Sequence, residues 1–135
     1  MKFFVVALSC MGLVSAHAQP AGWTSIGSSA NGNLTLEARD GSFELRLNGA
    51  KEEIAVITGK AVRGGPTGSV DLEKWYVRTK DCKNKQGKAV TLTMDGEFKY
   101  DNDFIFGAGN MTSGKAEFIC AVYDYLSAEK RGKSL

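Results

Sequence analysis

The stretch FIFGAGNMTSGKAEFICAVYDYL, residues 104–126, combines the signals that decide the fold. A short aromatic and apolar run typical of a strand passes through a glycine-rich turn into an amphipathic helix. Thr112 or Ser113 is expected to cap the N-terminus of this helix. At 100° per residue, Glu117 and Asp124 lie opposite an apolar side. That side consists of Ala116, Ile119, Val122, Tyr123 and Leu126.

The turn also matches part of a nucleotide-binding pattern. Residues 109–115, GNMTSGK, fit G-x-x-x-x-G-K between a strand and a helix. However, the next residue is Ala116, which has no hydroxyl group for Mg²⁺. Gly107 and Gly109 begin a dinucleotide fingerprint, but Thr112 stands where its third glycine belongs. We therefore interpret the turn as an ordinary connection and expect no cofactor.

Upstream, short segments of alternating polarity are separated by Asn-Gly and Asp-Gly pairs, which favour tight hairpins because both turn positions need positive φ. These pairs begin at Asn31, Asp40, Asn48 and Asp95. In residues 42–48, Phe43, Leu45 and Leu47 are expected to form one buried face. The pattern predicts an α+β domain: an antiparallel meander sheet of about six or seven strands with one C-terminal helix packed on it.

Three further segments carry structural expectations. Residues 63–71, RGGPTGSVD, predict a long exposed loop. Residues 72–82, LEKWYVRTKDC, predict a strand with Trp75 and Tyr76 on opposite faces, one ring in the core and the other more exposed. The polar tail after Ser127 is expected to fray.

The N-terminus reads as a secretory signal peptide. Lys2 precedes an apolar run from Phe3 to Val14, and residues 16–18, AHA, form a cleavage site of the A-x-A type. Cys10 makes a poor lipobox, because Ala7 stands where leucine is usual, so we expect no lipid anchor. No later run is long enough to span a membrane. We expect residues 1–18 to be cleaved and residues 19–135 to form a single secreted or periplasmic domain, with outer-surface association open.

Cleavage leaves two cysteines, Cys82 and Cys120, and in an exported chain these most simply form one disulfide. The loop between them is long enough for a bond to stabilise the domain by roughly 4 kcal/mol. Two buried thiols are the alternative. A zinc site is not expected, because two cysteines without histidine cannot complete a tetrahedral site.

The charge balance and the residue types limit the chemistry. The chain has 17 basic and 15 acidic residues, so no bulk charge attracts nucleic acid. The single histidine, His17, leaves with the signal peptide, which excludes Ser-His-Asp and Cys-His machinery. Asp101 and Asp103 share a strand face and leave a carboxylate-based hydrolase as a minor alternative. We expect no enzymatic activity.

Basic residues gather around Cys82: Lys80, Lys83, Lys85 and Lys88. Such a run is commonly only solvated. The sharper hypothesis is a surface for an acidic protein partner, made of Lys80, Lys83 and Lys85 with Arg78 and whichever of Trp75 and Tyr76 faces outward. Asn33 and Asn110 lie in N-x-T sequences, which are glycosylation acceptors only in a eukaryotic source.

Three pieces resemble the surface-adhesin protein E-like family of exported Gram-negative proteins. They are GWTSIGS at residues 22–28 with the Asn31-Gly32 turn, DCKN at 81–84, and SGKAEFIC at 113–120. The last two carry the cysteines. The D-x-x-S-I element that follows the first hairpin in the family is absent here. The resemblance implies an antiparallel sheet backed by helix, one disulfide, export, and non-catalytic binding of extracellular protein partners. It assigns no binding residue.

We therefore expect an exported, non-enzymatic binding protein, adhesin-like or envelope-associated. The alternative is a periplasmic inhibitor or immunity protein that blocks a lysozyme or another secreted hydrolase. An adhesin should present a broad face, for which the strand around residues 75–78 is the candidate. An inhibitor should present a protruding loop, for which residues 63–71 are the candidate.

Overall fold

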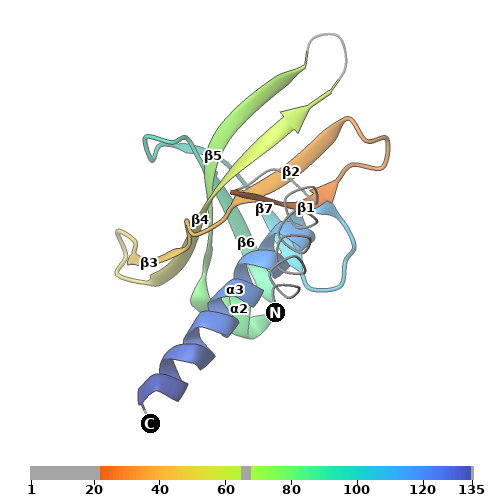
Figure 1. Cartoon of the computed structure of the whole chain (residues 1–135). Helices are drawn as coiled ribbons and strands as arrows, with labels where there is room; N and C mark the ends of the chain where they lie inside the picture. Colours follow the sequence, from red (N-terminus) through yellow and green to blue (C-terminus); the bar gives the residue numbers. More distant parts are fainter. Residues whose placement is uncertain (1–21, 65–67, 135) are drawn as a thin grey trace, which may run out of the picture.

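The computed structural model describes residues 22–64 and 68–134, so the predicted signal peptide lies outside the described residues. The strands are β1 (Trp23–Ser28), β2 (Leu34–Arg39), β3 (Glu44–Leu47), β4 (Glu53–Arg63), β5 (Ser69–Arg78), β6 (Gln86–Leu92) and β7 (Phe98–Ile105), and the helices are α2 (Thr79–Asn84) and α3 (Met111–Ser134). Figure 1 shows one curved sheet with the long helix α3 on one side. The predicted α+β class, with one C-terminal helix on an antiparallel sheet, is confirmed.

The sheet is antiparallel, with strands in the order β1-β2-β4-β5-β6-β7 and with β3 also paired to β4. The 11-residue β4 pairs through its first half with β3 and through its second half with β2. The chain leaves the sheet between β2 and β3, where Gly41 has a φ of +78°. Ser42 fills this gap, because its Oγ donates to the Arg39 carbonyl and accepts from the Thr58 N–H.

Strand pairing assigns each side chain to one of two faces. We call the face that carries Trp75 and packs against α3 the inner face, and the face that carries Tyr76 the outer face. Trp75 is completely buried and Tyr76 is half-buried, which identifies Trp75 as the core ring. The inner-face core joins strand residues Leu36, Ala38, Ala55, Ile57, Ala61, Val77, Ala89 and Phe104 to Ala116, Ile119 and Cys120 of α3.

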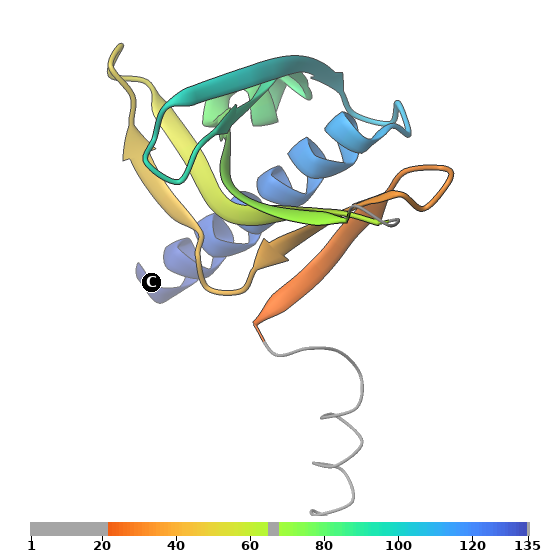
Figure 2. The same cartoon turned by 90° about the horizontal axis from the view of Figure 1, so that it is seen from above.

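Helix α3 begins at Met111, and its cap is Asn110, whose Oδ1 accepts a 2.8 Å hydrogen bond from the Ser113 N–H. The predicted caps Thr112 and Ser113 were wrong, since both lie within the first turn. The predicted apolar side is confirmed toward the N-terminus and becomes more exposed toward Leu126. The tail was predicted to fray after Ser127 but is helical through Ser134, consistent with its strong helix formers. This end extends past the strands (Figures 1 and 2).

The predicted disulfide is present. Cys82 and Cys120 are bonded, with their Cα atoms 5.5 Å apart, and the bond joins α2 to α3. The prediction that Cys82 ends a strand was wrong, because β5 stops at Arg78 and residues 79–84 turn into α2. The helix ends at Asn84, and Lys85 caps it with a φ of 62° by donating its N–H to the Cys82 carbonyl.

Two other local predictions need correction. Leu45 and Leu47 were expected to be buried, but they are 45% and 67% exposed. The reason is that, in the described part of the chain, β3 pairs only with β4 and receives no contact from α3. The loop expected over residues 63–71 is shorter, because β4 reaches Arg63 and β5 starts at Ser69; residues 65–67 of it lie outside the described part. Neither described helix has the length and apolar character of a membrane span.

Candidate functional site

The outer face is the candidate site, because α3 packs only on the opposite side of the sheet. Strand register places Val70 and Leu72 of β5 and Phe98 of β7 on this face. These side chains are between 50% and 64% exposed. Uncovered apolar groups that share one face are characteristic of surfaces that contact a partner.

The predicted partner-surface residues separate into three groups. Trp75 does not belong to the surface, because it is completely buried on the inner face. Tyr76 and Arg78 lie on the outer face and are half-buried. Lys80, Lys83 and Lys85 are exposed on or beside α2. We call the cations Arg78, Lys80, Lys83, Lys85 and Lys88 the α2 patch.

Arg78 holds the start of α2 in place through ion pairs, so its charge is not available to a partner protein. Its Nε and Nη2 atoms lie 3.1 and 3.2 Å from the two carboxylate oxygens of Asp81, and its Nη1 lies 3.2 Å from Glu52 Oε2. Lys80 Nζ approaches the same Glu52 oxygen at 3.0 Å. The hydrogen bonds from Lys80 and Asn48 lower the pKa of Glu52. Arg78 and Lys80 are therefore committed to local pairs, whereas Lys83 and Lys85 have no ion pair with the described chain.

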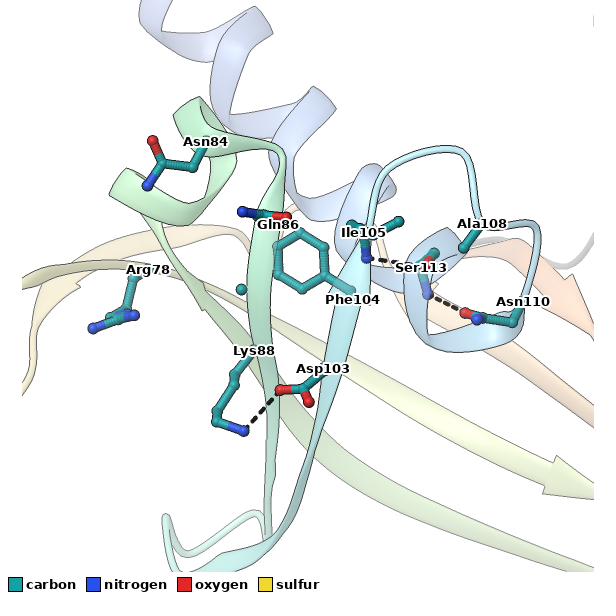
Figure 3. Close-up of a pocket in the computed structure, with 11 residues that line it drawn as sticks. Arg78, Asn84, Gln86, Lys88, Asp103, Phe104, Ile105, Ala108, Asn110 and Ser113 are labelled. Carbon is teal, nitrogen blue, oxygen red and sulfur yellow. Dashed lines mark hydrogen bonds and ion pairs between the residues drawn. The ribbon is translucent and has the colours of Figure 1, made fainter.

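A hollow of about 600 Å³ lies beside the α2 patch (Figure 3). Its lining comes from the end of β5, from α2, from the first half of β6, from β7 and from the start of α3. At its rim Lys88 Nζ lies 2.8 Å from Asp103 Oδ1, and this contact raises the pKa of Lys88. Asp103 and Asp101 share a face, as predicted, but Asp103 is occupied by this lysine. The described residues contain no cluster of three or more metal-binding side chains.

A second hollow, of about 410 Å³, lies farther along the outer face. It runs between the β3–β4 turn and the β6–β7 turn, and its floor is apolar, formed by Ile54, Val56, Tyr76 and Leu92. Lys74 lines the same hollow and has no ion pair within residues 22–64 and 68–134. Tyr76 contributes to this hollow and Arg78 to the larger one, so β5 connects them.

The glycine-rich turn before α3 has no phosphate-binding geometry. Lys115, which would contact a phosphate, points into the core: its Nζ lies 3.3 Å from Thr91 Oγ1 and 4.8 Å from the centroid of the Trp75 ring. Only 5% of Lys115 is exposed. The interpretation of residues 109–115 as a structural connection agrees with this placement.

A buried charged cluster on the inner face was missed by the sequence analysis. Glu73 accepts 2.8 Å hydrogen bonds from Trp75 Nε1 and from Lys99 Nζ, and Lys115 lies next to the same tryptophan. Burial lowers the pKa of Lys115 to about 8. The nearby negative charge of Glu73 acts in the opposite direction and raises this pKa, whereas the positive charge of Lys99 lowers it further. Two signals pointed to it. Glu73 lies two residues before Trp75 on β5, so both side chains are on the same face of the strand. Lys115 lies one helical turn before Ile119, so both are on the same face of α3.

Comparison with known protein families, curated protein sequences and solved structures finds no match to this chain. The fold and site together describe a small disulfide-bonded α+β domain with one sheet face open and a basic patch at the end of that face.

Proposed function

We propose that this domain is an exported, non-enzymatic binding protein, adhesin-like or envelope-associated, whose outer face and α2 patch contact a protein partner outside the cytoplasm. The disulfide between Cys82 and Cys120 is compatible with an extracellular or periplasmic location, because such bonds persist in oxidising compartments. The resemblance to surface-adhesin protein E-like proteins supports the same class of function.

The observation that carries the proposal is the exposure of large apolar side chains on the sheet face opposite α3. Phe98 is 64% exposed and Leu72 is 50% exposed, and both share this face with the half-buried Tyr76. Water-exposed apolar area is costly, and covering it with a partner is favourable by about 25 cal/mol per Å². Tyr76, which lines the second hollow, is also of a residue type that is enriched among the anchors of protein interfaces.

The charge of the α2 patch selects an acidic partner. Glu52, Asp81 and Asp103 neutralise Arg78, Lys80 and Lys88 through the contacts described above. Lys83 and Lys85 remain unmatched within the described chain. Two unmatched cations beside an apolar face favour partners with carboxylates at that position, chiefly by raising the association rate and rejecting basic competitors.

The test is a capture experiment with the mature chain, residues 19–135, immobilised and presented separately with extracellular matrix proteins and with lysozymes. We expect capture of an acidic matrix or envelope protein, and loss of capture in a Lys83→Glu/Lys85→Glu variant. Capture of a lysozyme together with loss of its activity would instead establish the inhibitor function. Absence of protein capture in both arms would contradict a binding function.

A further inference from the structure

The larger hollow contains three carboxamide side chains with unused hydrogen-bonding capacity. Asn84, Gln86 and Asn110 line it from α2, from β6 and from the residue before α3 (Figure 3). Asn110 uses its Oδ1 to cap the helix, but none of the three amide nitrogens donates a hydrogen bond to the described chain. A carboxamide offers both a donor and an acceptor, which is the same pair that a peptide group requires.

The hollow also has an apolar side. Ile105 is 51% exposed although it lies on a strand, and Ala108 lines the hollow after it, while Phe104 closes the floor and is 4% exposed. The volume of about 600 Å³ is within the range that holds a drug-sized ligand or a few residues of a chain. The arrangement suits one apolar side chain that rests on Ile105.

The charges inside the hollow are already satisfied. Arg78 is held by Asp81 and Glu52, and Lys88 is held by Asp103, so neither is a free receptor for a ligand's charge. Lys83 and Lys85, which have no ion pair within the described residues, are the chain neighbours of Asn84, and Asn84 lines the hollow from the end of α2. A ligand should therefore have a neutral, apolar centre and place its carboxylates outside the hollow.

We propose that the larger hollow binds an extended segment of the partner protein in which one apolar residue is flanked by Asp or Glu. The apolar side chain rests on Ile105 and Ala108, the main chain hydrogen-bonds to the carboxamides of Asn84 and Gln86, and the flanking carboxylates face the lysines of α2. The inference rests on the proposed function, because it specifies how that surface recognises its partner.

Selection of a displayed library of random 12-residue peptides on the immobilised mature domain tests this inference. We expect enriched peptides to contain Leu, Ile, Phe or Met next to Asp or Glu. Ile105→Asp should weaken their binding at least tenfold, and Gln86→Ala should weaken it severalfold. Both residues are exposed, so both variants should fold, which circular dichroism and thermal melting check.

The matched control is Leu45→Asp, which introduces the same charge at an exposed aliphatic residue of β3 that lines neither hollow. It should leave peptide affinity unchanged. Peptides that keep their affinity in Ile105→Asp and lose it in Leu45→Asp would overturn the inference while leaving the proposed function intact. Failure to enrich any such peptide would also overturn it, and the capture experiment then decides separately whether the domain binds proteins at all.

Discussion

The Nζ atom of Lys115 lies 4.8 Å from the centroid of the Trp75 ring, inside the interface between α3 and the sheet. Thr91 Oγ1 is its hydrogen-bond partner at 3.3 Å, and the Tyr100 ring lies 5.8 Å away. Among the charged groups around it, Glu73 of β5 and Lys99 of β7 already pair with each other at 2.8 Å. Within the described residues Lys115 is therefore a buried cation that forms no ion pair with a carboxylate, and burial lowers its pKa to about 8.

This relationship predicts a pH-dependent stability. An unfolded lysine has a pKa near 10.5, so between about pH 8 and pH 10.5 the unfolded chain binds a proton that the folded chain does not bind. The free energy of unfolding should rise as the pH increases through this window. Lys115→Met should stabilise the domain at pH 7 by at most about 3 kcal/mol, and the difference should vanish near pH 10.5. Urea unfolding of both proteins at several pH values measures this, and a difference independent of pH would refute it.

Removal of the disulfide should strongly destabilise the domain. Without the bond between Cys82 and Cys120, the unfolded chain regains the entropy of a long loop, which corresponds to roughly 4 kcal/mol. For a domain of this size the melting temperature should then fall by more than about 10 °C. Thermal melting with and without reductant measures this, with the Cys82→Ala/Cys120→Ala variant as a control that should not respond to reductant. An unchanged midpoint in reductant would contradict the predicted contribution.

Gly59 is required by its contact with the core tryptophan. An added Cβ atom would lie 2.3 Å from the Trp75 ring, which is completely buried and cannot move aside. Gly59→Ala should therefore destabilise the domain by about 1–3 kcal/mol or more. Gly49→Ala is the matched control, since no heavy atom lies within 4 Å of its added Cβ. Equal unfolding midpoints for the two variants would argue against this packing.

Local sequence signals predicted much of the sheet because they act through the backbone. Gly32, Gly41 and Gly96 have positive φ at the predicted turns. The third turn differs, because positive φ falls on Lys51 while Asn48 accepts the N–H groups of Ala50 and Glu52. Helix α2 could not be predicted, since six residues are too few for a helical period. Its start is held by the local ion pair of Arg78 with Asp81 and by tertiary contacts of Arg78 with Glu52 and of Thr79 with Glu53.

The candidate site was only partly predictable for the same reason. Alternation placed Trp75 and Tyr76 on opposite faces, but only the packing of α3 decides which face is buried. Composition identified the basic cluster around Cys82 but not its local partners. Glu52, which lies 26 positions before Arg78, neutralises part of that cluster through contacts that no local pattern contains.

The most direct test of the proposed binding surface is the affinity of the captured partner for the Lys83→Glu/Lys85→Glu variant, measured by calorimetry at low and physiological salt. We expect a loss of affinity of at least about tenfold, larger at low salt, because reversal of the charges of Lys83 and Lys85 repels an acidic partner. Arg63→Glu/Lys130→Glu, which reverses two exposed charges away from the outer face and the α2 patch, should change the affinity by less than about twofold. Equal affinities for the wild-type domain and the Lys83→Glu/Lys85→Glu variant would contradict the assignment of the binding surface.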